Sequence, residues 1–460
     1  MAGLVARCRY LTRAAALAAC LHAAPIFAGD ALPEVNIPVH VDALANGMQI
    51  LTIENHKIPA VNHAVWYRVG AVDEPRGKGG MAHFLEHLLF KGTERFPKGT
   101  LSRMVARSGG EDNAFTMQET TGYYQYVPKD QLERMMEIEA DRMQFATFSQ
   151  GDVDSERQVV LEERLMRTDN EPESALWEQM QPALFLRHPY RNPVIGWAEE
   201  VKSLTRDDLL RFYRRHYAPS NAFVVIAGDV TREEAVALAT KYYGNLPAAK
   251  ALPRKETPVE PDVRMAETRL IVRDPRTDVA SWARAYRTAS YDKTAPGDAY
   301  AKEILADILG GGQDSPLYKE LVTDKKLATD VSVYYSPAGL RYSTFSLSAT
   351  APDGKDVEET AKAADAFLRR DPSFWLTDDA LDASRSRMLA ERIFQSEDVR
   401  GLAFLYGKYF AVFGDVDYLQ HRNDGLKAVT KDDLRRAFLS MRDDSRNADG
   451  FSLPLVGLGK

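Results

Sequence analysis

Hydrophobic positions recur along the chain with two periods, one typical of strands and one typical of helices. The pair Asn46-Gly47 separates two short apolar runs, 39–44 and 48–53, and predicts a β-hairpin because this pair favours a type I′ turn. Residues 63–69 predict another strand, and 111–127, rich in Thr, Tyr and Phe, predict a hairpin. A buried strand is expected over 221–229, and helices are expected over 81–90, 99–108, 129–145, 153–167, 205–217 and 231–243.

The second half of the chain opens with the same order, strands first and helices afterwards. A strand pair at 269–272 and 279–287 precedes a helix over 298–309; further strands are expected at 328–335 and 342–349, and further helices at 357–369 and 378–394. Between the halves, 246–263 carries four prolines among charged residues, which is typical of a linker. We therefore expect an α+β fold of two homologous domains, each a mostly antiparallel sheet flanked by helices.

The first 28 residues have the pattern of a secretory signal peptide. A basic start with Arg7, Arg9 and Arg13 is followed by an apolar run that ends at Ala28 and is too short to span a membrane. The alternative is lipoprotein anchoring through Cys20, because Leu17-Ala-Ala-Cys20 has the form of a lipoprotein cleavage box. We expect an exported, periplasmic protein divided into a signal peptide (1–28), a first domain (29–245), a linker (246–262) and a second domain (263–460).

Cysteine content and charge restrict the chemistry of the mature chain. Both cysteines, Cys8 and Cys20, lie in the leader, so after cleavage at Ala28 no disulfide can form and a metal site must use His and carboxylate ligands. Loss of the three leader arginines changes the formal net charge from −7 to −10. An acidic chain argues against general nucleic-acid binding, and no apolar stretch after the leader is long enough for a transmembrane segment.

The sequence His83-Phe-Leu-Glu-His87 lies inside the apolar helix predicted over 81–90. Residues four apart on a helix share a face, so the two histidines can hold one metal ion. Glu86, three residues after His83, lies on the same side and can reach a metal-bound water without being a ligand. The pattern predicts a zinc site, with manganese and cobalt as alternative metals.

Catalytic zinc normally has three protein ligands and one open position. With no cysteine available, the third ligand must be a histidine or a carboxylate. The helix predicted over 153–167 offers Glu156, Glu162 and Glu163. Glu156 and Glu163 are two helical turns apart and share a face, whereas Glu162 points elsewhere. An acidic helix can equally be a solvated face, so these residues alone leave the third ligand open.

Six segments of the chain carry distinctive motifs. They are Gly70-Ala-Val-Asp-Glu-Pro75, Gly80-Met-Ala-His-Phe-Leu-Glu-His-Leu-Leu-Phe-Lys-Gly-Thr93, Asn113-Ala-Phe-Thr116, Glu156-Arg-Gln-Val-Val-Leu-Glu-Glu163, His188-Pro-Tyr190 and Tyr217-Ala-Pro-Ser-Asn221. Together they resemble the pitrilysin and mitochondrial-processing-peptidase family of inverted zinc peptidases. The resemblance covers most of 38–245 and, more weakly, the second half.

The resemblance implies a zinc endopeptidase or oligopeptidase with one Zn²⁺ per chain. Glu163 would be the third ligand beside His83 and His87, and Glu156 would steer ligands or water within the catalytic site. A zinc-activated water would attack the peptide bond, with Glu86 as general base. Asn113, Ala114, Phe115 and Thr116 would form an edge strand on which an extended peptide substrate adds as a further strand.

The sequence departs from the family at one place. Many members carry an Arg and a Tyr, seven residues apart, in a late domain, where they hold substrate; here Val322 and Thr329 stand at those positions. We therefore expect a metal-bearing subunit that encloses a chamber on dimerisation with a homologous subunit supplying the Arg and Tyr. The alternative is a peptide-binding or assembly subunit whose metal site is not catalytic.

Overall fold

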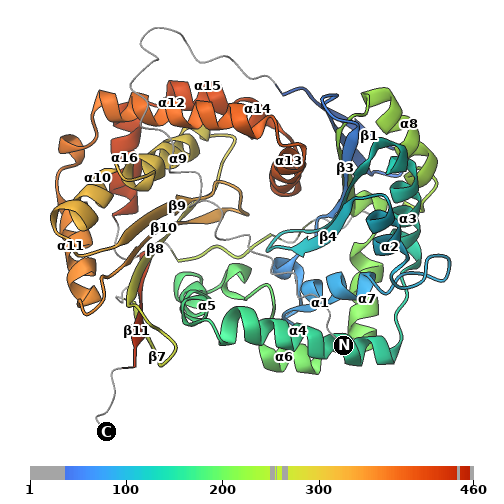
Figure 1. Cartoon of the computed structure of the whole chain (residues 1–460), viewed down its shortest axis with the longest axis horizontal. Coiled ribbons are helices and arrows are strands. Elements are labelled where there is room, and N and C mark those ends of the chain that lie inside the picture. Colours follow the sequence, from blue (N-terminus) through green and yellow to red (C-terminus); the bar gives the residue numbers. More distant parts are fainter. Residues whose placement is uncertain (1–36, 249–253, 255, 262–267, 443–445, 456–460) are drawn as a thin grey trace. The chain divides into compact units, whose positions relative to one another are not determined.

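The computed structural model describes residues 37–248, 254, 256–261, 268–442 and 446–455 (Figure 1). The predicted signal peptide and Cys20 lie outside this part of the chain. All of these described residues belong to one compact unit. None of the helices in the described residues has both the length and the apolar character needed to cross a membrane.

Within the described residues, the first half of the chain builds a six-stranded sheet in the order β1-β2-β6-β3-β5-β4. Its strands are β1 (Val39–Ala43), β2 (Gln49–Glu54), β3 (Ala60–Tyr67), β4 (Glu111–Thr116), β5 (Thr121–Pro128) and β6 (Ala222–Gly228). The hairpin predicted at Asn46-Gly47 joins β1 to β2, but the predicted type I′ turn is wrong, because only Gly47 has a positive φ, of 90°, and Asn46 does not. The side chain of Asn46 is buried and donates to the carbonyl of Tyr243 at 2.7 Å.

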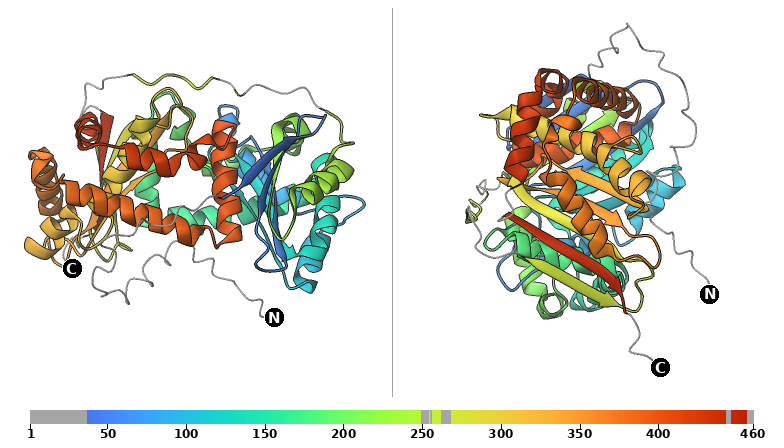
Figure 2. Two further views of the ribbon diagram at one scale, coloured as in Figure 1. Left: turned by 90° about the horizontal axis from the view of Figure 1, so that it is seen from above. Right: turned by 90° about the vertical axis from the view of Figure 1, so that its left-hand side faces the viewer.

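The second half builds a sheet whose five described strands have the order β7-β11-β8-β10-β9. They are β7 (Arg269–Asp274), β8 (Ser281–Ala289), β9 (Asp330–Tyr335), β10 (Tyr342–Thr350) and β11 (Asn447–Pro454). The predicted pairing of the first two strands is wrong, because β11 lies between β7 and β8 and bonds to both (Figure 2). Strand β11, from near the end of the chain, thus separates two strands that were expected to pair with each other.

The two sheets share one topology. Without β1, the order β2-β6-β3-β5-β4 has the same connectivity as β7-β11-β8-β10-β9, with the last strand of each half inserted beside the first. The inserted strand runs parallel to that first strand in both sheets, while the other pairs are antiparallel. The prediction of two homologous, mostly antiparallel α+β halves is therefore confirmed, although the boundaries at 245 and 263 stay a prediction.

Helices follow the strands in the same order in both halves. The helices between β3 and β8 are α1 (Met81–Leu89), α2 (Thr100–Arg107), α3 (Leu132–Phe145), α4 (Gln150–Arg164), α5 (Pro172–Leu184), α6 (Ala198–Ser203), α7 (Arg206–His216) and α8 (Arg232–Tyr243). Those after β8 are α9 (Pro296–Gly310), α10 (Pro316–Tyr318), α11 (Val357–Arg369), α12 (Asp378–Gln395), α13 (Val399–Phe413), α14 (Asp417–Gln420), α15 (Arg422–Ala428) and α16 (Lys431–Met441). By position in the topology, α9 is the counterpart of α1.

Each half lends one helix to the sheet of the other half. Helix α13 packs on β3 and β6, and its counterpart α5 packs on β7 and β11 (Figure 1). Gly407 of α13 makes the close approach to the first sheet, since a Cβ at this position would lie 2.3 Å from the Trp66 ring. Phe404 and Phe410 of α13 contact Trp66 and Phe223 of the first sheet. One hydrophobic core thus joins side chains from both halves.

Candidate metal centre

Helix α1 carries His83, Glu86 and His87 and is held firmly at its start. Its first backbone N–H groups are capped by Glu74, whose carboxylate accepts from Gly80 N at 3.0 Å and from Ala82 N at 2.7 Å. Gly80 has a φ of 81° and packs so closely on the 195–196 backbone that no Cβ would fit. The apolar side chains of α1 lie in a second hydrophobic core, which is built from residues of the first half alone. The polar side chains are therefore presented from a fixed helix.

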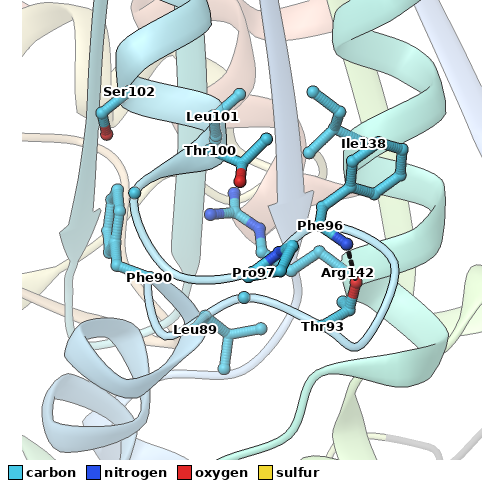
Figure 3. A pocket seen from close by; sticks show the side chains of 12 residues that line it. Leu89, Phe90, Thr93, Phe96, Pro97, Thr100, Leu101, Ser102, Ile138 and Arg142 are labelled. Carbon is cyan, nitrogen blue, oxygen red and sulfur yellow. Dashed lines mark hydrogen bonds between the residues drawn. The ribbon is translucent and has the colours of Figure 1, made fainter.

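The loop after α1 is also closely packed, as Figure 3 shows. Phe96 N donates to Thr93 Oγ1 at 2.9 Å, and Leu101 and Ile138 close the loop from neighbouring helices. The cavity beneath the loop has a volume of only about 20 Å³. That volume accommodates about one water molecule. This pocket is therefore part of the support of α1 rather than a substrate site.

Helix α4 brings Glu163 against the two histidines of α1. Oε2 of Glu163 lies 3.2 Å from His87 Nε2 and 3.6 Å from His83 Nε2. One ligand atom from each of the three residues lies within 4.8 Å of the others, which makes this the one such metal-capable group among the described residues. In a tetrahedral zinc site with bonds of about 2.0–2.1 Å, ligand atoms lie about 3.3 Å apart. The two separations from Glu163 to the histidines match this spacing.

Burial and charge set the protonation of these groups. Burial lowers the pKa of His83 to about 4, and the adjacent His87 acts in the same direction, so His83 is neutral at pH 7. Burial opposes the charge of His87, but hydrogen bonds to Glu156 and Glu163 raise its pKa to about 9. Burial likewise opposes the charge of Glu163, but His87, His83 and Arg167 together lower its pKa to about 2. The carboxylate is thus ionised, as a metal ligand requires.

Two further side chains support the ligands from outside. Nδ1 of His87 lies 3.2 Å from Oε1 of Glu156, which leaves Nε2 directed toward Glu163. Lys91, which follows the end of α1, forms an ion pair with the other oxygen of Glu156. Because a carboxylate on the second nitrogen of a ligand histidine fixes its tautomer, this arrangement suits a metal ligand. By contrast, Nδ1 of His83 is buried with no hydrogen-bond partner in the described residues.

Glu163 is also held by Arg167, which lies one turn further on. The Arg167 guanidinium is 2.5 Å from Oε1 of Glu163, leaving Oε2 to face the histidines. The helix predicted over 153–167 changes here, since α4 ends at Arg164 and the next turn, Leu165–Asp169, is a π-helix. Glu162 is exposed, as its position on the helix predicted.

Glu86 is buried on the same helix as the two histidines. Burial raises its pKa to about 7, whereas a hydrogen bond from Thr116 and the charge of His87 act in the opposite direction. Thr116 Oγ1 donates to Oε2 of Glu86 at 2.6 Å. A carboxylate whose pKa lies near neutrality can both accept and return a proton, which is the requirement for general acid–base chemistry.

Asn113, Ala114, Phe115 and Thr116 lie on β4, the strand at one edge of the first sheet. Strand β4 bonds to β5 alone among the described strands, and its last residue contacts Glu86. Phe115 packs against Trp66 and against Phe404 of α13. The strand predicted to bind substrate therefore lies next to Glu86, the predicted general base.

Val322 and Thr329 lie in the second half. Val322 is in a π-helical turn, Lys319–Asp324, and packs partly against the core, while Thr329 is exposed next to β9. Sequence reasoning missed the contributions of Lys91, Arg167 and Glu74 to the site. The spacing of four residues between His87 and Lys91 was the available signal, although Lys91 lies two residues beyond the end of α1.

The fold and this arrangement of side chains define an inverted zinc-peptidase architecture, and comparison with known families agrees. Residues 49–197 match the family described as Insulinase (Peptidase family M16), and 203–388 match that described as Peptidase M16 inactive domain. The chain belongs to this pitrilysin and insulinase-like family of peptidases. The second match includes α7, β6 and α8, so its boundary differs from that between the two sheets.

Individual relatives are named as proteases. The chain is 29% identical over 391 residues to the zinc protease PqqE of Helicobacter pylori, which covers 83% of this chain and 86% of the relative. The crystal structure of a protease from Helicobacter pylori superimposes with a TM-score of 0.84 at 27% identity, covering 91% of this chain and all of that one. The first half of the periplasmic protease PqqL of Escherichia coli shares the fold, with a TM-score of 0.76, 22% identity and coverage of 92% and 93%.

Proposed function

We propose that this chain is a zinc-dependent endopeptidase or oligopeptidase in which His83, His87 and Glu163 hold one Zn²⁺ and Glu86 is the general base. The observation that carries the proposal is the convergence of the three ligand atoms beside a buried carboxylate. When bound, zinc would polarise the peptide carbonyl and increase the acidity of water. Glu86 would accept the proton of the attacking water and return it to the leaving amine, with Thr116 fixing its orientation.

The proposed substrate is an extended, unfolded peptide. An edge strand presents unpaired backbone groups that can bond to a further strand, and β4 is such a strand. A peptide paired with Asn113–Thr116 would run past Glu86, because Thr116 is in contact with that carboxylate. Backbone pairing selects for extended conformation rather than for sequence, which suits an enzyme acting on unfolded chains.

We further propose that the chain is the metal-bearing subunit of a heterodimer that encloses a chamber. Val322 has no hydrogen-bond donor, and the short Thr329 hydroxyl donates to the Thr350 carbonyl at 3.3 Å, so neither stands in for an Arg or a Tyr at a developing oxyanion; a homologous partner would supply these two groups. The leader 1–28 would direct the protein out of the cytoplasm, and the mature chain would comprise domains 29–245 and 263–460 joined by the linker 246–262.

Cleavage of a quenched, unstructured peptide by the zinc-loaded mature chain tests the central proposal. Glu86→Gln should keep its zinc and lose about 10²- to 10⁴-fold in turnover, while Glu162→Gln, an exposed change on α4, should leave both unchanged. Equal cleavage by the Glu86→Gln variant would refute the role of the base.

The partner is tested by adding a homologous chain that lacks the metal motif. Stimulation of cleavage together with a stable complex in light scattering would support the heterodimer. Full activity of the isolated chain would overturn it. Zinc binding with no cleavage under either condition would favour a binding subunit with a non-catalytic metal site.

A further inference from the structure

A cavity of about 840 Å³ lies apart from the metal ligands, where α7 meets the segment 72–78 and residues 256–258. Its lining is unusually basic. Six cationic side chains line it against three carboxylates, those of Asp73, Asp208 and Glu256; the cations are Arg68, Arg76, Lys78, Arg211, Arg215 and Arg254. None of His83, Glu86, His87 or Glu163 is among the lining residues.

Three of the six cations form ion pairs with two of the three carboxylates. Asp208 pairs with Lys78 at 2.9 Å and with Arg211 at 2.5 Å. Asp73 pairs with Arg254 at 3.3 Å. Arg254 still has a buried Nε with no hydrogen-bond partner in the described part of the chain.

The remaining three cations, Arg68, Arg76 and Arg215, have no carboxylate within ion-pair distance among the described residues. Arg68 is the most enclosed of them: it lies over the rings of Phe223 and Phe410 and donates to the amide oxygen of Gln49 at 2.7 Å. Burial lowers its pKa to about 10, and the charge of Arg254 acts in the same direction. A partly buried guanidinium is costly unless an anion accompanies it.

We propose that this cavity binds a small phosphate-bearing molecule. Arginine forks match phosphate oxygens in pairs, and arginine is preferred over lysine for such recognition. A volume of several hundred Å³ is typical of small-molecule sites. Ser220 and Asn221, which precede β6, line the same cavity and add polar groups for the uncharged part of the ligand; the Asn221 amide nitrogen already donates to the His216 carbonyl at 2.9 Å.

Isothermal titration of the zinc-loaded full mature chain with fructose 1,6-bisphosphate and with inorganic phosphate tests this site. Arg215→Gln changes an exposed side chain and should fold normally; Arg68→Gln removes the enclosed guanidinium. Loss of a charge-assisted contact predicts a fall in bisphosphate affinity of about tenfold for each variant. Arg214→Gln is the matched control, because this neighbouring arginine on α7 does not line the cavity. The bisphosphate affinity of this variant should stay within about twofold of that of the unchanged chain.

Three results would overturn the assignment. The first is no binding of either phosphate probe at millimolar concentration. The second is an equal loss of bisphosphate affinity in Arg214→Gln and Arg215→Gln. The third is tighter binding of tricarballylate, which carries carboxylates and no phosphate, than of the bisphosphate. Glu163→Gln should bind the bisphosphate as the unchanged chain does, which separates this site from the proposed zinc centre. Loss of binding in Glu163→Gln would place the ligand on the metal and also refute the proposal.

Discussion

Thr116 Oγ1 and Glu86 Oε2 lie 2.6 Å apart, so the last residue of an edge strand holds the buried carboxylate of the metal helix. This bond joins the surface where a peptide would pair to the group that would accept a proton.

Thr116→Val should lower kcat about tenfold while zinc content stays unchanged, because one hydrogen bond of about 1 kcal/mol and the orientation of Glu86 are lost. Thr116→Ser keeps the hydroxyl and should retain most activity. Steady-state cleavage of the quenched peptide with metal analysis of each variant makes the comparison. Similar activity in the Val and Ser variants would contradict this role for the hydroxyl.

Glu163→Gln should weaken zinc binding by more than about 100-fold, since changes to outer partners of metal ligands alone cost about 10- to 100-fold. The neighbouring Glu162→Gln is the matched control, because that side chain is exposed and faces away from the histidines. Competition with a fluorescent zinc chelator measures both affinities. Equal affinities would remove Glu163 from the ligand set.

Glu156 and Lys91 should act on the metal as one unit. Glu156→Gln and Lys91→Met are each expected to lower zinc affinity about tenfold, because His87 loses its fixed orientation. The double variant should be little worse than either single variant, since residues that share one contact are not additive. Additive losses in the same chelator competition would show that Lys91 acts independently of Glu156.

Gly407→Ala should lower the free energy of unfolding by about 1–3 kcal/mol, the usual cost of overpacking a core. The added methyl would meet the Trp66 ring, where α13 lies on the first sheet. Gly297→Ala near the start of α9 is the control, because nothing lies within 4 Å of the position that its added methyl would take. Thermal melts of the two variants should therefore differ, and a normal melting temperature for Gly407→Ala would contradict the close contact.

Glu260→Gln should destabilise the protein by about 2 kcal/mol at pH 7, because the buried carboxylate accepts three backbone hydrogen bonds. Burial opposes ionisation, but the bonds from His188, Arg187 and Leu186, with Arg287, lower its pKa. The folded pKa therefore lies below the unfolded one, so this stabilisation is present above about pH 4.5 and is lost as the pH falls through the folded value.

Melting temperatures at pH 7 and at pH 3–4 measure this effect. The unchanged chain should lose more stability on acidification than Glu260→Gln does. Glu256→Gln, an exposed change four residues away, should show the full acid dependence of the unchanged chain. The same acid dependence in Glu260→Gln would show that Glu260 does not contribute to it.

Much of the candidate metal centre could be predicted from the sequence, because its residues fall into pairs that are close together on a single helix. His83 and His87 are one turn apart on a helix, so their side chains share a face wherever that helix packs. Glu156 and Glu163 are likewise two turns apart on one helix. The positions of most strands along the chain could be expected in outline, as could the hairpin at Asn46-Gly47, since turn chemistry acts between neighbours.

The tertiary structure decided what depends on distant segments. Four features join residues that are far apart in the chain. They are the contact of α1 with α4, the hydrogen bond from Thr116 to Glu86, the insertion of β11 between β7 and β8, and the packing of α5 and α13 on the sheet of the other half. The basic cavity likewise combines Arg68, Arg215 and Arg254 from three separate segments. Periodicity fixes which face of an element is apolar, but it does not specify which partner covers that face; packing of the whole chain determines that.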